Sequence, residues 1–224
     1  PNTSGNQVPV PSALYLAASG VGALGVIDND CVDVSNLQRQ VLYDAASVGR
    51  PKAESAAQRL RALNPEIQLI AHQVELCAAN VLEIFGAYDV VLDGTDRFTT
   101  RYLSNDACVL TRKPLVSAAI HRFEGQAMTY LPGRGPCYRC LFPEPPADGL
   151  VPNCAEAGVL GVLPGVMGTI QATEAIKLIV GVGEPLVGRI LTYDALAMRF
   201  EEFRFKRRID CAVCGDRPTI TAPQ

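Results

Sequence analysis

The first half of the chain alternates short apolar runs with amphipathic helical patterns, and this alternation restricts the fold more than any other feature. The apolar runs have the length and composition of buried strands, and the segments between them repeat at about the helical period of 3.6 residues. Strands are predicted over residues 24–28, 67–74, 88–92 and 115–119, and helices over 13–19, 51–63, 78–85 and 101–110. This order predicts a parallel sheet with crossover helices.

The second half of the chain follows a different pattern. Residues 126–131 resemble an antiparallel strand, and the pattern predicts a long apolar helix over residues 164–180 and a closing hairpin over 189–193 and 198–205. Residues 132–152 are rich in proline and glycine and make the one long irregular stretch. We therefore expect an α/β fold with a Rossmann-like, mostly parallel sheet, flanking helices and antiparallel C-terminal strands.

Length and composition indicate one globular domain. A chain of 224 residues can bury a full core, so we expect a single domain over residues 1–224. With 19% charged residues and a net charge of -3, no basic face favours a nucleic-acid partner. No apolar run reaches the roughly 20 residues that span a bilayer, and residues 1–4 lack the features of a signal peptide. The sequence thus favours a soluble cytoplasmic protein with no membrane partner.

A polar stretch lies between the first predicted strand and the helix that follows it. Residues 35–40 read Ser-Asn-Leu-Gln-Arg-Gln, which offers directional donors suited to a nucleotide or a phosphate. Upstream, Asp28 and Asp30 stand where an open α/β sheet places an acid that binds a ribose hydroxyl. Downstream, Lys52 adds a cation near a helix start. The alternative is a solvated surface loop.

A second group of carboxylates ends the strand predicted at 88–92. Asp93 and Asp96 lie at the edge where doubly wound sheets bind ligands. Magnesium prefers hard oxygen ligands and commonly takes one or two carboxylates together with substrate phosphates. One of the two acids is therefore a candidate magnesium ligand. The alternative is that Thr95 or Asp96 caps the next helix.

Four of the eight cysteines form two Cys-x-x-Cys pairs, which favour a metal over disulfides. Two such pairs can complete a tetrahedral zinc site, and four thiolates leave no open position for water, so the zinc would be structural. A redox dithiol is the alternative for either pair alone. The predicted ligands are Cys137, Cys140, Cys211 and Cys214.

The remaining cysteines and the histidines give weaker signals. Cys154 follows the proline-rich stretch, outside both pairs, and is either a nucleophile or an idle thiol. Three other cysteines lie beside apolar residues and are interpreted as small core or surface thiols. No motif provides a partner for either histidine, so both are interpreted as structural or surface residues. These five residues are Cys31, Cys77, Cys108, His72 and His121.

Residues 20–25 match the dinucleotide-binding pattern G-x-G-x-x-G letter by letter. The match follows a predicted helix and precedes a predicted strand, which is the reverse of the context that the mechanism requires. We interpret it as a helix-to-strand turn.

Taken together, these motifs resemble the MoeB/ThiF family of adenylyltransferases, which are related to ubiquitin-activating enzymes. The resemblance runs from about Ala13 to Thr221. It implies that ATP and magnesium activate the C-terminal Gly-Gly carboxylate of a small ubiquitin-like sulfur carrier as an acyl-adenylate, with release of pyrophosphate. The carriers of such enzymes serve molybdopterin synthesis, thiamine synthesis or tRNA thiolation. The motifs that carry the resemblance are residues 35–40, 48–52, 92–96 and 154–159 and the two Cys-x-x-Cys pairs.

The resemblance also implies roles for single residues. Asp28 is expected to hold the adenosine ribose, Asn36 and Arg39 the phosphates, and Lys52 the charge that develops as pyrophosphate leaves. Asp96 is expected to bind magnesium, and Cys154 matches a cysteine that in some relatives links covalently to the carrier. The other residues expected to line the nucleotide site are Asp30, Ser35, Gln38 and Arg97.

The family also sets expectations that this sequence does not display. Members carry a strand and a glycine-rich loop before the helix at Ala13, and an N-terminal arginine that reaches into the partner subunit's site, which implies a homodimer. Some relatives continue into a C-terminal rhodanese-like domain, and a sulfurtransferase or cysteine desulfurase is an expected partner. Two other functions remain open: an NAD(P)-dependent oxidoreductase, and a non-catalytic, zinc-stabilised module that docks a ubiquitin-like protein.

Overall fold

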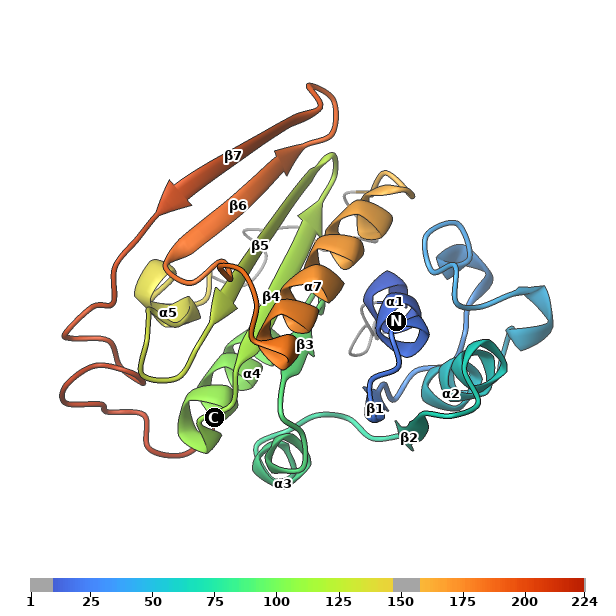
Figure 1. Cartoon of the computed structure of the whole chain (residues 1–224), viewed down its shortest axis with the longest axis horizontal. Coiled ribbons are helices and arrows are strands. Elements are labelled where there is room, and N and C mark those ends of the chain that lie inside the picture. Colours follow the sequence, from blue (N-terminus) through green and yellow to red (C-terminus); the bar gives the residue numbers. More distant parts are fainter. Residues whose placement is uncertain (1–9, 147–157, 224) are drawn as a thin grey trace.

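The computed structural model describes residues 10–146 and 158–223, in which helices and strands alternate through most of the chain (Figure 1). Two short 3-10 turns, η1 (Val34–Asn36) and η2 (Ala45–Ser47), follow the first strand. The helices are α1 (Val10–Ala18), α2 (Lys52–Leu63), α3 (Val81–Gly86), α4 (Phe98–Thr111), α5 (Tyr138–Leu141) and α7 (Leu163–Val180). The strands are β1 (Ala23–Ile27), β2 (Gln68–His72), β3 (Val91–Asp93), β4 (Leu115–His121), β5 (Glu124–Tyr130), β6 (Arg189–Asp194) and β7 (Arg199–Arg204).

These elements confirm most of the predicted segments. The predicted strands and helices overlap observed ones, although the short helix predicted at 78–85 begins at Val81. The G-x-G-x-x-G match begins in the turn between α1 and β1, as expected, and its last three residues open β1; Gly20 has a φ of 76°, in the left-handed region that favours glycine. Within the predicted irregular stretch, residues 138–141 form the short helix α5.

The first sheet consists of β1 and β2, which pair in parallel from Ala23↔Gln68 to Ile27↔His72. Helix α2 covers it. The helix presents small and apolar residues at helical spacing to the strands, which is why this segment folds as an amphipathic helix. Its buried positions are Lys52, Ala53, Ser55, Ala56, Ala57 and Leu60.

The second sheet has the strand order β3-β4-β5-β6-β7. Strands β3 and β4 are parallel, whereas the pairs β4–β5, β5–β6 and β6–β7 are antiparallel. The prediction of a mostly parallel sheet is therefore wrong for the described strands, which form one parallel and one mixed sheet. The reason is local: β4 and β5 are joined through only Arg122 and Phe123, and so short a connection allows only antiparallel pairing.

The described strands also form two sheets where one was expected. No described strand pairs with β1 on the side facing β3, and a groove of about 330 Å³ lies between the two strands. Residues of α1, α4 and α7 contribute to its lining. The hydroxyl of Tyr88 lies against Gly25, where a Cβ atom would collide with it. The Tyr88 hydroxyl also lies 2.7 Å from His72 Nε2, so the segment that leads into β3 contacts the last residue of β2.

Helix α7 packs on one face of the five-stranded sheet, and α1 lies on the other side of α7 (Figure 1). Leu16 of α1, Val116 of β4, and Ala172 and Ala175 of α7 share one buried cluster. The close approach of the two helices is possible because Gly168 faces Pro11, and a Cβ atom at Gly168 would lie 2.8 Å from the proline ring. Helix α7 is therefore the central helix of the described fold.

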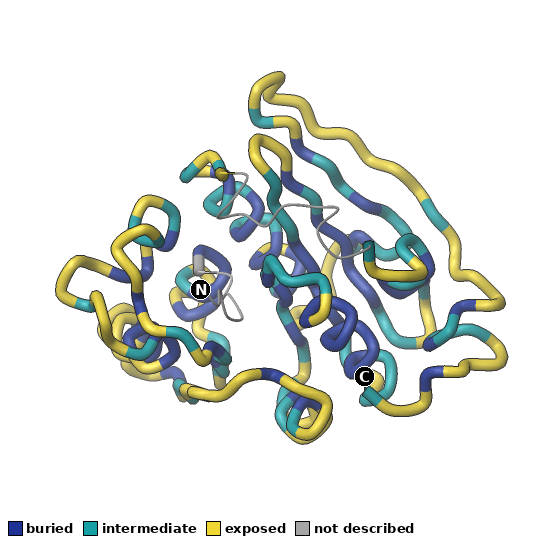
Figure 2. The backbone as a smooth tube through the Cα atoms, turned by 180° about the vertical axis from the view of Figure 1, so that it is seen from behind, coloured by how far each residue is buried: buried dark blue, intermediate teal, exposed yellow. Residues whose placement is uncertain are grey.

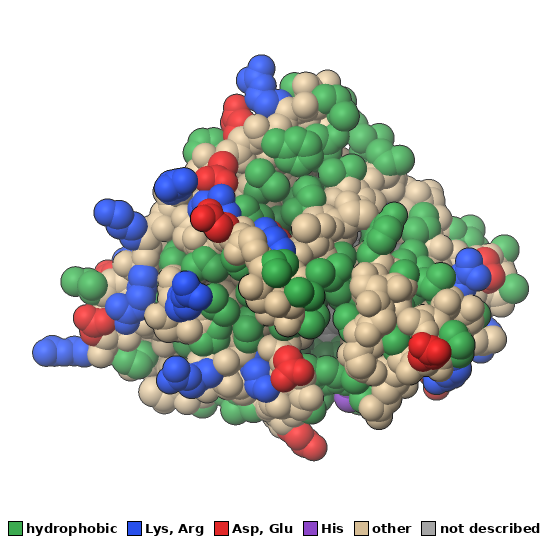
Figure 3. Space-filling model, in the orientation of Figure 1, with side chains coloured by type: hydrophobic (Ala, Val, Ile, Leu, Met, Phe, Trp, Pro, Cys, Tyr) green, Lys and Arg blue, Asp and Glu red, His purple; other side chains and the backbone are tan. Residues whose placement is uncertain are grey.

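Burial decreases from this centre toward two margins of the molecule. Every residue of the edge strand β7 is exposed, as is much of the segment over residues 29–50 (Figure 2). Basic side chains gather at the margin formed by β7 and the segment after it (Figure 3). Several of them pair with neighbouring acids, for example Arg207 with Asp216 at 2.8 Å. None of the helices described here is long and apolar enough to span a membrane.

Helix α2 offers a test of the packing of the first sheet. Replacing Leu60, which is fully buried, by alanine should lower the free energy of unfolding by about 2–5 kcal/mol, because it removes a core side chain and leaves a cavity. Leu63, half exposed on the same helix, is the matched control, and Leu63→Ala should have a much smaller effect. Urea titration followed by circular dichroism measures both, and equal losses would contradict this packing.

Candidate functional site

The end of β1 places Asp28, Asp30 and Lys52 together. Asp28 follows the strand and is completely buried, and its Oδ1 accepts a hydrogen bond from the backbone N–H of Asp30 at 2.9 Å. The ammonium group of Lys52, the first residue of α2, lies 3.1 Å from Oδ2 of Asp30 and is 3% exposed. Lys52, the cation expected near the helix start, is therefore held in place by Asp30, one of the two acids predicted at the ribose position.

The polar stretch at 35–40 begins with a 3-10 turn. Asp33 accepts hydrogen bonds from the backbone N–H of Ser35 at 2.7 Å and from its hydroxyl at 2.6 Å. These bonds hold the pKa of the Asp33 carboxyl below its ordinary value. Asn36 Nδ2 donates to the Ser35 hydroxyl at 3.4 Å, and Arg39 Nη1 donates to the Ser35 carbonyl at 3.2 Å. Ser35 thus stabilises this turn, and both Asn36 and Arg39 hydrogen-bond to it.

The next residues of this stretch contact the chain that leads into α7. A Cβ atom at Gly161 would lie 2.6 Å from both the carbonyl oxygen and the Oε1 of Gln38. Gln38 itself is exposed. The backbone before α7 therefore lies against the predicted nucleotide-binding stretch, and only a glycine fits this approach.

The end of β3 is fixed by the carboxylate of Asp93. Its Oδ1 accepts from the backbone N–H of Thr95 at 3.1 Å and from the Thr95 hydroxyl at 2.8 Å, and its Oδ2 accepts from Ser117 at 3.3 Å. Arg101 Nη2 donates to the Thr95 carbonyl at 2.6 Å, with its Nε 3.8 Å from Asp93. Asp93 is thus committed to shaping the turn that presents Asp96.

The alternative that Thr95 or Asp96 caps the following helix is wrong for this turn. The N-cap position of α4 is Arg97, whose side chain makes no capping hydrogen bond, so neither Thr95 nor Asp96 holds that position. Arg97 lies 3.6 Å from Glu75 at the surface.

Three of the predicted basic residues act electrostatically on the carboxyl group of Asp96. Burial raises the pKa of its carboxyl, while the positive charges of Arg39, Arg97 and Lys52 act in the opposite direction. Arg97 is the next residue, whereas Arg39 and Lys52 come from distant segments, so their charges act on Asp96 only because of the fold. The result is a partly buried carboxylate under the influence of three cations, beyond the carboxyl end of a strand.

The sequence did not indicate Tyr43, Arg101 or Gln171. Tyr43 is buried near Asp28 and Asp30, and burial followed by these two charges raises the pKa of its hydroxyl. Arg101 lies in a helix where nothing in the pattern distinguishes it from a surface arginine. Gln171 gives the clearest missed signal, because it is a polar residue in the middle of a mostly apolar helix.

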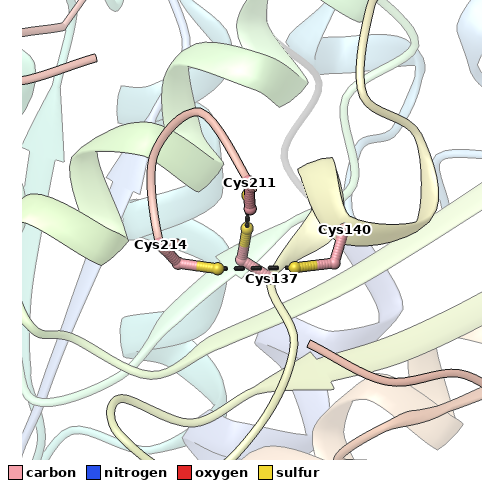
Figure 4. A group of neighbouring side chains, drawn as sticks. All are labelled: Cys137, Cys140, Cys211 and Cys214. Atoms are coloured by element: carbon pink, nitrogen blue, oxygen red, sulfur yellow. Dashed lines mark hydrogen bonds between the residues drawn. The ribbon is translucent and has the colours of Figure 1, made fainter. Parts of the chain in front are cut away.

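The second predicted site is a cluster of four sulfur atoms (Figure 4). Cys137 immediately precedes α5 and Cys140 lies within it, whereas Cys211 and Cys214 lie in the C-terminal segment. The Sγ atoms of Cys137 and Cys211 are 3.6 Å apart, those of Cys140 and Cys214 are 3.4 Å apart, and all four lie within 4.8 Å of one another.

These distances suit a metal better than disulfides. A disulfide would bring two sulfurs to about 2.05 Å, whereas four Zn–S bonds of about 2.3 Å in a tetrahedron separate the sulfurs by about 3.8 Å. The four-cysteine cluster can therefore hold a metal ion, as the sequence predicted.

Charged and polar contacts attach the cysteine cluster to α4. Arg139, between the first two cysteines, donates to both carboxylate oxygens of the buried Asp106, at 2.8 and 2.7 Å. The backbone N–H of Tyr138 donates to Asn105 at 2.8 Å, and the Tyr138 ring lies 5.9 Å from the Arg101 guanidinium. Because Arg101 also binds the Thr95 carbonyl, one helix contacts both predicted sites.

The other predicted thiols and histidines match their sequence interpretation where the structure describes them. Cys31 and Cys77 are exposed and Cys108 is buried, while Cys154 lies outside the described residues. His72 is a partly buried structural residue, and burial lowers its pKa.

The profile of the ThiF family matches residues 10–213, which include the predicted nucleotide site and three of the four clustered cysteines. This chain belongs to the ThiF family. It is 54% identical over 215 residues to the sulfur carrier protein adenylyltransferase of Thermus thermophilus, covering 94% of this chain and 79% of that protein. It is also 54% identical over 206 residues to the SAMP-activating enzyme E1 of Haloferax volcanii, covering 92% and 76%.

Larger relatives share the same region. The pig protein named adenylyltransferase and sulfurtransferase MOCS3 is 51% identical over 215 residues, which are 96% of this chain but only 47% of that protein. Among solved structures, Escherichia coli MccB with ATP matches 92% of this ThiF chain and 64% of its own, with a TM-score of 0.82. The sequence identity to MccB is 23%, so this likeness supports the fold alone.

Gly215 provides a test of the cysteine cluster. A Cβ atom there would lie 2.7 Å from the Cys211 nitrogen and the Ile209 carbonyl oxygen, and backbone atoms cannot move aside as a flexible side chain can. Gly215→Ala should therefore distort the second Cys-x-x-Cys pair and lower the metal content of the purified protein, as measured by plasma mass spectrometry. Gly22→Ala, where the added atom meets nothing within 4 Å, should leave the metal content unchanged. Full metal occupancy in both variants would contradict this geometry.

Asp96 provides a test of the electrostatics. Because its pKa is raised, its ionised form is less favourable in the folded than in the unfolded protein, so the free energy of unfolding falls as pH rises above about 3.8, the ordinary Asp value. Without added magnesium at pH 7, Asp96→Asn should melt at the same temperature as the unmodified protein or higher. Asp106→Asn breaks the buried ion pair with Arg139 and should lower the free energy of unfolding by about 3 kcal/mol. Equal decreases in melting temperature for the two variants would contradict this electrostatic environment of Asp96.

Proposed function

We propose that this ThiF protein uses ATP to adenylylate the C-terminal Gly-Gly carboxylate of a ubiquitin-like sulfur-carrier protein and releases pyrophosphate. The observation that carries the proposal is the buried Lys52–Asp30 ion pair at the end of β1, together with the positive charges of Arg39, Lys52 and Arg97 that act on Asp96, within a chain about half identical to proteins named for this activity. An NAD(P)-dependent oxidoreductase would not use this set of cations, and the relatives do not favour a non-catalytic docking module.

The chemistry of adenylylation suits these residues. The attacking carboxylate is already ionised at neutral pH, so no general base is needed. Catalysis then consists of holding the reactants in line and neutralising charge on the phosphates. We assign Arg39 and Asn36 to the phosphates and Lys52 to the charge that develops as pyrophosphate leaves. The ion pair with Asp30 keeps the Lys52 ammonium in place for this role.

The remaining nucleotide contacts are assigned by position. Asp28, completely buried at the end of β1, is assigned to the ribose. Asp30, Ser35, Gln38 and Arg97 complete the proposed site, with Ser35 supporting the turn rather than reaching outward.

The donor atoms fit two metals of different kinds. Asp96 offers a hard carboxylate oxygen, and its surrounding cations attract the phosphates that would share a magnesium ion with it. Bound there, magnesium would neutralise phosphate charge. The four cysteines fit zinc in a structural site, because they fill all four tetrahedral positions.

The assembly is also a proposal. We propose a homodimer that binds a ubiquitin-like carrier with a C-terminal Gly-Gly and cooperates with a sulfurtransferase or a cysteine desulfurase. Support for the sulfur-transfer partner comes from MOCS3, whose name joins both activities in one longer protein. Cys154 is proposed to link covalently to the carrier, and residues 1–224 are proposed to form one adenylyltransferase domain.

Exchange of labelled pyrophosphate into ATP tests the proposed reaction directly. With magnesium and a panel of carriers ending in Gly-Gly, exchange should depend on one of the carriers. Arg39→Ala and Asp96→Asn should each lower its rate roughly 100-fold or more, since the first removes a positive charge on the reacting phosphates and the second removes the proposed magnesium ligand. Arg61→Ala, at an exposed position of α2, is the control and should leave the rate unchanged. No exchange with any carrier, despite folded and metal-loaded protein, would overturn the proposal in favour of a docking module.

A further inference from the structure

Gln171 is a completely buried polar side chain in the middle of α7. Its Nε2 donates hydrogen bonds to the carbonyl oxygens of Asp93 and Val116, both at 2.8 Å. Its Oε1 accepts a hydrogen bond from the hydroxyl of Ser12, also at 2.8 Å. One amide therefore connects four elements: α7, β3, β4 and α1.

The partners fix the orientation of this amide. Two carbonyl oxygens can only accept, so the NH₂ group must face them, and the hydroxyl of Ser12 donates to the opposite end. A glutamate at this position would direct an oxygen at two carbonyl oxygens. A methionine of similar length would remove the hydrogen bond that each of the two carbonyls accepts from this amide.

The hydrogen bond to the Asp93 carbonyl is the one that bears on the site, because Asp93 is the last residue of β3. The turn that begins there leads directly to Asp96. The carboxylate of Asp93 is held by Thr95 and Ser117, while its carbonyl is held by Gln171. Asp93 is thus fixed through both its side chain and its main chain.

The same amide also sets the position of α1. Ser12 lies in the first turn of α1, and its single O–H is shared between the Gly168 carbonyl at 3.0 Å and Oε1 of Gln171 at 2.8 Å. A change at Gln171 would therefore release the first turn of α1 and the end of β3 together.

We propose that Gln171 is a positioning residue for the nucleotide and magnesium site, acting through Asp93 to fix the place of Asp96. The inference rests on the proposed function. Gln171 itself touches neither nucleotide nor metal in this role.

Glu174 provides a matched comparison one turn further along α7. It is also buried, and its Oε2 accepts from the Thr129 hydroxyl at 2.8 Å and from the backbone N–H of Leu186 at 2.6 Å. These contacts fasten α7 to β5 and to the segment before β6. Glu174 therefore anchors the same helix without contacting the end of β3.

The experiment compares Gln171→Met with Glu174→Gln in the full chain. ATP binding is measured by calorimetry with and without magnesium, and the ratio of the two dissociation constants reports how strongly metal and nucleotide binding are coupled. Gln171→Met should reduce this ratio about 10–100-fold, the usual effect of losing a group that orients a metal ligand. It should also raise the magnesium concentration for half-maximal pyrophosphate exchange, with the rate recovering at saturating magnesium. Glu174→Gln should change neither value, even where it lowers the melting temperature.

The outcomes separate the two proposals. If the unmodified protein shows no magnesium-dependent ATP binding, the proposed function falls and this inference falls with it. If it does, and Gln171→Met retains the same ratio, only the positioning role is overturned.

A second variant covers the case in which Gln171→Met does not fold. Ser12→Ala removes the hydroxyl that holds Oε1 and leaves the two bonds from Nε2 in place. It should shift the ratio in the same direction by a smaller factor, and an unchanged ratio would overturn the role of Gln171.

Discussion

The pairing of the polar groups buried at the end of β3 is the interaction on which the rest of the site depends. Asp93 is 3% exposed, and its carboxylate and carbonyl both have partners inside the protein. A buried polar group without a partner costs about 1–3 kcal/mol, so the chain can turn here only if each group is satisfied. Thr95, Ser117 and Gln171 satisfy them, and the turn toward Asp96 has one conformation as a result.

The cysteine cluster is connected to this turn through α4. The two Cys-x-x-Cys pairs are 74 residues apart in sequence, so a metal would join α5 to the C-terminal segment. Arg139 and Asp106 attach α5 to α4, and Arg101 of α4 binds the Thr95 carbonyl. A structural metal would thereby support the site through packing, at a distance from the reacting groups.

Several features could be predicted from the sequence because they depend on local chemistry. The helix-to-strand turn at residues 20–25 followed from the order of its neighbours, and Gly20 has the φ that such a turn requires. The cysteines could be grouped because two-residue spacing places both thiols of a pair on one side of a turn. The position of Asp28 followed from the end of an apolar run, which is where β1 stops.

What the sequence alone determined is therefore the order and type of the elements, the cysteine ligand set and the polar segments that meet at the site, since these depend on spacing and periodicity. The tertiary structure decided what spacing cannot encode. It brought the charges of Arg39 and Lys52 to act on Asp96, separated β1 and β3 into two sheets, and buried Arg101 and Gln171 against the end of β3. In each case the partner is distant in the sequence, and which groups face each other is fixed only when the elements pack and every buried polar group finds a partner.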